Sequence, residues 1–230
     1  MFKNGFYAVL GGAFLIGASV SVFATPAAAA DGWYASGNVG GAALQESFST
    51  GKVGALTATG DVDFDTGYGL SGAIGYASGP FRLEGELSYR INDLDQVDVE
   101  SLAAGSIIFT NLGVAALQGD VSSFGFMANG FYDFDIGSNW TPFVMAGIGG
   151  ASINLDATSV GGVAVTYDES DTVLAYQVGA GIGYKFSPTT TVNFQYRFFG
   201  TSDPTFNDGT VEIDGEYLSH NFWVGITQRF

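Results

Sequence analysis

Two adjacent residues near the C-terminus, Ser219 and His220, are of the types that can hydrolyse an ester. A histidine can take the proton of a serine hydroxyl, and a nearby carboxylate can orient that histidine. Asp214 and Glu216 precede the pair in the sequence. Neighbouring residues of a strand point to opposite faces, however, so the two side chains could not meet in an extended segment. We therefore interpret His220 as a surface histidine among aromatic residues and predict that the chain is not an enzyme.

Three alternating aspartates, Asp61, Asp63 and Asp65, form a second group with possible chemistry. Calcium loops use this alternation, but they also need a glycine at the sixth position and a glutamate at the twelfth. Here Gly67 comes one place late, and no glutamate stands at the twelfth position. We predict no bound cofactor. Loosely bound divalent cations at the acidic segments stay open as an alternative to a solvated acidic surface.

Charged and apolar residues alternate along residues 81–92. One parity carries the charged residues Arg82, Glu84, Glu86 and Arg90, and the other carries Phe81, Leu83, Leu87, Tyr89 and Ile91. Successive side chains of a strand point to opposite faces, so this pattern predicts a strand with one apolar and one charged face. The segment alone does not decide which face meets water.

The same alternation recurs in eight segments, each long enough to cross a bilayer as a tilted strand. They cover residues 32–43, 66–78, 81–92, 122–135, 141–155, 172–186, 191–199 and 217–230. The connections alternate between short turns, near 79, 137 and 188, and long loops, at 44–65, 93–121, 156–171 and 200–216. Short turns on one side and long loops on the other are typical of transmembrane barrels. We predict an all-β fold, an eight-stranded antiparallel up-and-down transmembrane β-barrel.

The first 30 residues form a separate unit. Lys3 precedes an apolar run over 5–23, and three alanines at 28–30 suit signal-peptide cleavage before Asp31. An uncleaved anchor helix is the alternative. We predict a signal peptide over 1–30, export through the Sec pathway, and a barrel domain over 31–230. That domain would keep all 23 acidic residues and lose one of the seven basic ones, a balance that excludes a nucleic-acid partner.

The charges divide between the loops and the strands. The four long connections hold 18 of the 23 acidic residues. The inward parity of the strands holds a set that we predict to pair across the lumen: Arg82, Glu84, Glu86, Arg90, Asp133, Lys185, Arg197 and Arg229. The interior of an eight-stranded barrel is just wide enough for side chains to fill it. This predicts a plugged barrel rather than an open pore.

Apolar and aromatic residues complete the expected outer surface. On residues 141–155 the apolar parity, which we expect to face lipid, carries Phe143, Met145, Ala151, Ile153 and Leu155. At the short-turn end we predict an interfacial girdle made of Trp33, Tyr76, Phe81, Phe134, Trp140, Phe143, Tyr184, Phe186 and Phe230.

The chain resembles the eight-stranded outer-membrane β-barrel family, the OmpA-like and opacity-type surface proteins of Gram-negative bacteria within the porin-like superfamily. The resemblance covers 31–230, and it is carried by GWYASGNVG, TPFVMAGIGG, AYQVGAGIGYKFSPTTTVNFQYRFFG and SHNFWVGITQRF. It implies a location in the outer membrane, among lipid and lipopolysaccharide. It also implies that Gly225 and Phe230 belong to the signal read by the barrel-assembly machinery, although Gln228 departs from the usual apolar residue.

The resulting prediction is a surface protein with a structural or adhesive role, whose acidic loops meet host or environmental ligands. The first alternative is a narrow porin-like channel for small solutes. The second follows from the resemblance, because some similar barrels hydrolyse lipid A with a serine and a histidine; it would assign that role to Ser219 and His220.

Overall fold

The computed structural model describes residues 31–230, except residues 46, 105–106 and 208–210. The predicted signal peptide lies outside the described residues. The described chain forms twelve β-strands that belong to one sheet. None of these residues belongs to a helix long and apolar enough to span a membrane.

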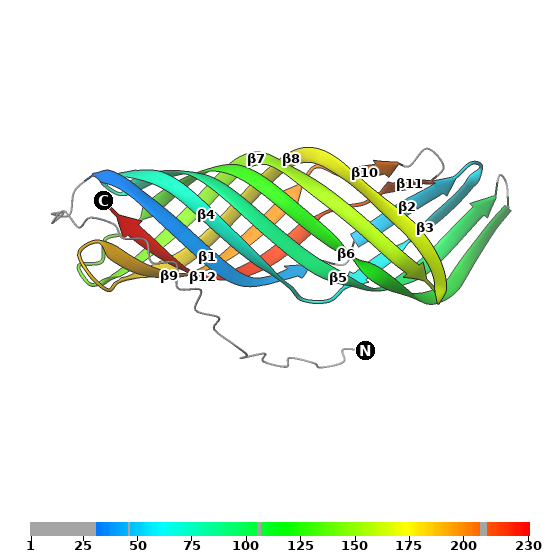
Figure 1. Ribbon diagram of the computed structural model, residues 1–230. Helices are drawn as coiled ribbons and strands as arrows, with labels where there is room; N and C mark the ends of the chain where they lie inside the picture. Colours follow the sequence, from blue (N-terminus) through cyan, green and yellow to red (C-terminus); the bar gives the residue numbers. More distant parts are fainter. Residues whose placement is uncertain (1–30, 46, 105–106, 208–210) are drawn as a thin grey trace.

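Eight strands close a barrel (Figure 1). In chain order they are β1 (Gly32–Leu44), β4 (Gly67–Ser78), β5 (Phe81–Ala104), β6 (Ile107–Asp133), β7 (Trp140–Val160), β8 (Val163–Lys185), β9 (Thr190–Thr201) and β12 (Leu218–Arg229). Each is antiparallel to its neighbours in the order β1-β4-β5-β6-β7-β8-β9-β12, and β12 pairs again with β1. The closed ladder leaves no free edge at membrane level, as a bilayer requires. All eight predicted strands and the up-and-down topology are confirmed.

The predicted long loops are largely β-structure instead. Strands β5 to β8 continue far beyond the predicted ends, and β7 joins β8 through Gly161 and Gly162, whose φ angles of 58° and 81° allow a two-residue turn. Two hairpins complete this extension of the barrel at the end opposite the short turns: β2 (Ser47–Val53) with β3 (Leu56–Phe64), and β10 (Thr205–Asn207) with β11 (Val211–Asp214). Strand β3 pairs with β5 and β2 with β11, so the extension continues the barrel wall (Figure 1).

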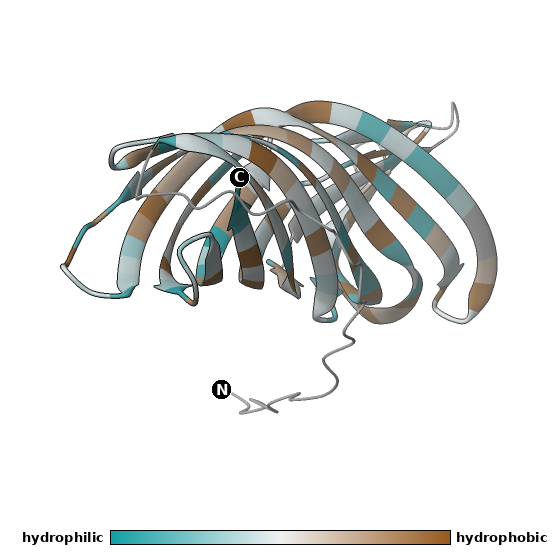
Figure 2. Cartoon of the chain, turned by 60° about the vertical axis from the view of Figure 1, so that its left-hand side comes forward, coloured by the Kyte–Doolittle hydropathy of each residue, from teal (hydrophilic) through white to brown (hydrophobic). Residues whose placement is uncertain are grey.

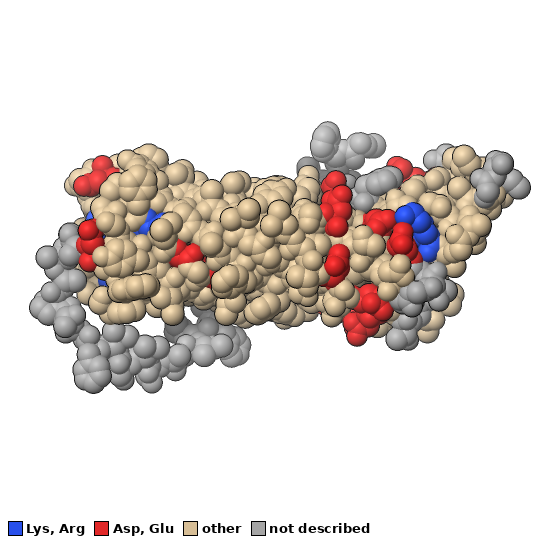
Figure 3. Space-filling view, turned by 90° about the horizontal axis from the view of Figure 1, so that it is seen from above, with Lys and Arg blue, Asp and Glu red and all other residues tan. Residues whose placement is uncertain are grey.

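Hydropathy alternates along the barrel strands (Figure 2). The exposures of the side chains show that the apolar parity faces outward. Leu83 of β5 is 70% exposed and Phe126 of β6 is 62% exposed. Glu86, on the opposite parity of β5 from Leu83, is 0% exposed. The face seen in Figure 3 has a middle zone almost free of charge between two charged ends. An apolar outer belt around a polar interior is the arrangement of a membrane barrel.

One strand was assigned the wrong face by sequence. Phe143, Met145, Ala151 and Ile153 of β7 are buried inside the barrel, whereas Val144 and Ile148 face outward. Both parities of β7 are apolar, so alternation alone cannot decide between them. Register decides: Phe143 lies opposite Gly181, where an added Cβ would come within 2.5 Å of the Phe143 Cζ. The ring therefore occupies the space that Gly181 leaves in the lumen.

The aromatic girdle forms without Phe143. Its outward-facing rings pack in pairs across neighbouring strands, with centroid distances of 5.4 Å for Trp33–Tyr76, 5.3 Å for Phe81–Tyr132 and 4.8 Å for Trp140–Tyr184. Tyr132 was not predicted to belong to it. These rings mark the short-turn end of the apolar belt, where aromatic residues sit at the membrane interface.

Candidate functional site

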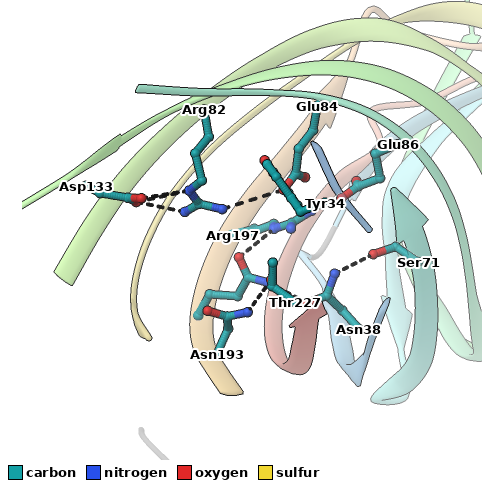
Figure 4. A network of polar contacts seen from close by, with 11 residues as sticks. Tyr34, Asn38, Ser71, Arg82, Glu84, Glu86, Asp133, Asn193, Arg197 and Thr227 are labelled. Carbon is teal, nitrogen blue, oxygen red and sulfur yellow. Dashed lines mark hydrogen bonds and ion pairs between the residues drawn. The ribbon is translucent and has the colours of Figure 1, made fainter. Parts of the chain in front are cut away.

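A network of buried polar side chains, the plug, lies inside the barrel (Figure 4). Arg82 of β5 donates from Nε and Nη2 to the two carboxylate oxygens of Asp133 on β6, at 2.9 Å each. The same guanidinium lies 3.6 Å from Glu84, which also accepts a 2.8 Å hydrogen bond from the Tyr34 hydroxyl of β1. A bidentate arginine–carboxylate contact fixes both groups in one plane. The plug therefore ties three strands together near the short-turn end.

The centre of the plug is an ion pair between Arg197 of β9 and Glu86 of β5, 2.5 Å apart. Arg197 is 1% exposed and Glu86 is 0% exposed. Gln177 of β8 donates to Glu86 at 3.2 Å and to Asn129 of β6 at 2.7 Å. Strands on opposite sides of the barrel are thus bonded directly to one another through its axis.

Arg90 is held differently from the other buried arginines. Within the described part of the chain it forms no ion pair. Its Nε donates to Asn221 at 3.0 Å, one Nη donates to Ser88 at 3.1 Å, and its Cζ lies 4.1 Å from the Phe199 ring centroid. A cation over an aromatic face is stabilised by the ring quadrupole. Phe199 and Trp223, which sequence reasoning did not single out, thus join the plug.

Lys185 and Arg229 lie outside this network. Both line a cavity of about 760 Å³ at the short-turn mouth, together with Asp31, Asp133 and Asp135. Neither forms an ion pair with any described residue. They were predicted to pair across the lumen, but they lie at its open end, where water can solvate their charges.

A second cavity, of about 500 Å³, lies in the extension, on the side of the plug away from the short turns. Its walls are mainly apolar and come from the inward faces of β3, β5, β7, β8 and β10, including Val62, Leu94, Val99, Leu155, Tyr167 and Phe206. The sequence did not reveal this cavity, because the segments that line it were interpreted as loops. The interior of the barrel therefore changes from polar at membrane level to apolar above it.

Comparison with known proteins agrees with this architecture. The family model for the outer membrane protein beta-barrel domain matches residues 13–230. The chain belongs to this outer-membrane β-barrel family. The protein accordingly resides in the outer membrane, with its apolar belt in contact with lipid. The predicted family and location are confirmed.

Two curated relatives and one solved structure are similar to the chain. The chain is 25% identical to outer membrane protein PagN of Salmonella typhimurium over 66% of each chain. It is 28% identical to Major surface antigen 4 of Anaplasma marginale over 64% of this chain, but only 53% of that protein. Neisserial surface protein A shares the fold, with a TM-score of 0.51 and 16% identity over 86% of this chain and 97% of that one.

The possible hydrolytic pair of this barrel is separated by the wall. Ser219 points into the lumen, where its hydroxyl donates to Asn221 at 3.3 Å. His220 lies on the outer face, with its Nδ1 2.7 Å from the Tyr196 hydroxyl and its ring near Phe198. The two side chains therefore cannot exchange a proton, as the strand argument predicted.

The possible metal ligands are not brought together either. Asp63 accepts a 2.7 Å hydrogen bond from the Gln96 side chain, and the Asp65 backbone amide donates to the Asp93 carbonyl. No three histidine, cysteine or acidic side chains of the described chain form a group that could hold a metal ion. Asp61 lies opposite Asp98, a like charge, in the β3–β5 ladder.

Gly225 and Phe230 each have a structural role that is independent of assembly. A Cβ added at Gly225 would overlap the Asn38 side-chain oxygen, so glycine leaves room for the buried Asn38 side chain between β1 and β12. The Phe230 amide donates to the Trp33 carbonyl at 3.1 Å, which continues the β1–β12 ladder to the last residue. Its ring is exposed with the girdle.

Proposed function

We propose that this barrel is a non-enzymatic surface protein whose plugged lumen serves as a rigid base for an acidic extracellular extension, with a structural or adhesive role. The observation that carries this is the Arg197–Glu86 pair, which crosses the lumen with almost no solvent exposure. Water or ions would have to displace buried, bonded charges to pass, and breaking such a pair is costly.

The competing function is a narrow channel for small solutes. Planar-bilayer recordings of the purified barrel discriminate the two, because a plug predicts little or only transient current. We expect Glu86→Ala combined with Arg197→Ala to open a conductance that the natural protein lacks, and Lys185→Ala, at the solvated mouth, to leave the recordings unchanged. A steady conductance of the natural protein, unaltered by the double substitution, would exclude the plug.

Surface exposure of the extension is tested on intact cells. We expect external protease to cleave within the extension while the membrane-level strands stay protected. Adhesion to host or environmental surfaces should fall when the β2–β3 and β10–β11 hairpins are replaced by short turns, with the barrel still folded. Unchanged adhesion after that deletion would remove the adhesive role and leave the structural one.

Divalent cations would have a role at the outer rim. Asp93, Asp120, Asp156 and Asp168 are successive register partners on β5, β6, β7 and β8. Like charges directly opposite one another destabilise a sheet. Burial and then the charges of Asp156, Asp93 and Asp168 raise the pKa of the Asp120 carboxyl. Loosely bound cations would screen this row, and the phosphates of the neighbouring lipopolysaccharide, without a preformed site.

Chelation tests the cation proposal. We expect a chelator to increase cleavage of the extension by protease, and Asp120→Asn to reduce that increase because it removes the central charge of the row. Asp31→Asn, at the opposite end of the barrel, is the control. Equal cleavage with and without the chelator would contradict the proposal.

Assembly in the outer membrane would depend on Gly225 and Phe230 as a signal for the barrel-assembly machinery. Deleting Phe230 should slow membrane insertion in cells while leaving spontaneous refolding into lipid vesicles nearly unchanged. If both processes slowed together, the Phe230 backbone bond to Trp33 rather than a recognition signal would account for the effect.

A further inference from the structure

We infer that the apolar cavity of the extracellular extension binds a small apolar molecule that carries no negative charge, taken up from the medium outside the cell. The cavity has a volume of about 500 Å³, within the range of small-molecule sites in proteins. Its position inside a surface-exposed extension, above a filled lumen, makes it accessible from outside rather than from the periplasm.

The lining favours an apolar ligand. Buried and half-buried side chains of one cluster, among them Leu94, Val121, Ile153, Leu155 and Phe206, face the cavity from strands around the wall. Apolar cavities hold water poorly because it finds too few hydrogen-bond partners there. An apolar molecule gains free energy by replacing that water in proportion to the area it buries.

One polar group lies at the cavity wall. Tyr217 is 3% exposed, and among the described residues its hydroxyl has no hydrogen bond of ordinary geometry, although the Ser123 hydroxyl is near enough to form a weak one. A buried hydroxyl without a full hydrogen bond costs free energy. A ligand hydroxyl, amine or carbonyl would satisfy it, so Tyr217 is expected to orient the polar end of the ligand.

The charge around the cavity excludes anions. Glu216 is the one charged residue among the described residues that line it. The outer surface of the same extension carries the acidic row that begins at Asp93 and Asp120. The negative charges of Glu216 and of the acidic row both repel an anion that enters the low-dielectric interior, where Coulomb interactions are strongest. Fatty acids and similar anions should therefore bind more weakly than neutral or cationic molecules of equal size.

A seam in the wall provides a route of entry. Strand β10 is an end strand in the sheet order. The ladder between β8 and β9 begins at Ala175, so the earlier residues of β8 pair with β7 but with no described strand on their other side. Among the described contacts, one side-chain hydrogen bond joins the two strands here, from the Thr205 amide to Asp171 at 3.0 Å. Tyr167 and Phe206 line the cavity on the two sides of this seam.

The experiment is a fluorescence titration of the full chain in lipid nanodiscs. The probe is N-phenyl-1-naphthylamine, which is neutral, and its anionic counterpart is 8-anilinonaphthalene-1-sulfonate. Nanodiscs without protein measure partition into lipid. Leu155→Trp fills the cavity from β7, and Val99→Phe fills it from β5. Ile148→Trp, on the lipid face of β7, is the matched control, and heat-dependent gel mobility verifies that each variant is folded.

We expect saturable binding of the neutral probe that weakens at least tenfold in either filled variant and is unchanged by Ile148→Trp. The anionic probe should bind at least tenfold more weakly than the neutral one, and Glu216→Gln should narrow that difference. Equal binding of the neutral probe by the natural protein and both filled variants would overturn the proposal. So would native mass spectra in which the natural protein, but not Leu155→Trp, retains a nanodisc lipid, because a lipid tail would then be the occupant.

Discussion

The Arg197–Glu86 pair allows a quantitative test of what stabilises the barrel interior. Removing one partner of a buried ion pair leaves an uncompensated charge and costs about 3–5 kcal/mol. The two single substitutions should not be equal, however. Arg197→Met leaves Glu86 with the Gln177 hydrogen bond at 3.2 Å and with the favourable field of Arg90. Glu86→Gln leaves Arg197 and Arg90, two buried cations, without that carboxylate.

We therefore expect the cost in unfolding free energy to be about 3 kcal/mol for Arg197→Met and about 5 kcal/mol for Glu86→Gln, the two ends of the range for a broken buried pair. The double variant Glu86→Leu with Arg197→Met replaces the pair by apolar groups of similar length. Such replacements are often close to neutral. The double variant should consequently be more stable than either single one.

The assay is reversible urea unfolding in phospholipid vesicles, followed by tryptophan fluorescence, with stability taken by linear extrapolation. Lys185→Met is the control, because this exposed residue at the mouth should change stability by less than about 0.5 kcal/mol. If the two single costs are each below about 1 kcal/mol and simply add in the double variant, the side chains do not interact and our account of the plug is wrong.

Three further predictions follow from the outer face, the packing and the extension. Leu87→Lys should destabilise the barrel in vesicles by about 2–4 kcal/mol, since it puts a charge on the lipid face; an unchanged unfolding midpoint would reverse our assignment of that face. Gly181→Val should lower the unfolding midpoint because its Cβ meets the Phe143 ring, and adding Phe143→Ala should restore part of the loss; no restoration would refute this contact. Hydrogen bonds from Thr205 and then Lys52 hold the pKa of the Asp214 carboxyl below its usual value, so this stabilisation is present above about pH 3.9 and is lost as the pH falls further. Amides of β2 and β11 should therefore exchange faster at pH 3 than at pH 6 relative to membrane-level strands, and Lys52→Met should shrink the difference; an identical pH response in that variant would exclude the ion pair as its cause.

The sequence contains signals for more β-structure than we predicted from the lengths of the connections. Period-2 alternation located all eight barrel strands, because lipid outside and polar groups inside impose opposite requirements on the two faces. Alternation resumes in residues 93–100 with a change of phase at Gln96: Leu94 lies between Asp93 and Asp95, and Val99 lies between Asp98 and Glu100. Two glycines at 161–162, between alternating segments, are also a strong hairpin signal. Both signals were overridden by the expectation that long connections are loops.

The pairing inside the lumen could not be predicted in the same way. The alternation predicts that Arg90 and Arg197 point inward, but it does not predict which groups they contact. Those contacts depend on the tilt of the strands and on which residues of opposite strands lie at the same height in the lumen. Arg197 finds Glu86, whereas Arg90 finds Asn221 and the Phe199 ring. The face of β7 was ambiguous for a related reason, since Phe143 and Val144 are both suitable for lipid and for a packed interior.

Strand β5 shows how one alternation serves two environments. Up to Asp95 its odd residues face outward, as apolar Leu83 and Leu87 in the lipid zone and as acidic Asp93 and Asp95 beyond it. Over the same residues its even side chains face inward, changing from charged Glu86 to apolar Leu94. Beyond the register irregularity between Asp93 and Gln96, the odd residues Val97 and Val99 line the cavity instead. Lipid requires an apolar exterior and so leaves the lumen for polar groups, whereas water requires the reverse. The apolar cavity is therefore a consequence of extending the wall of a membrane barrel into water, where the inward side chains rather than the outward ones become apolar.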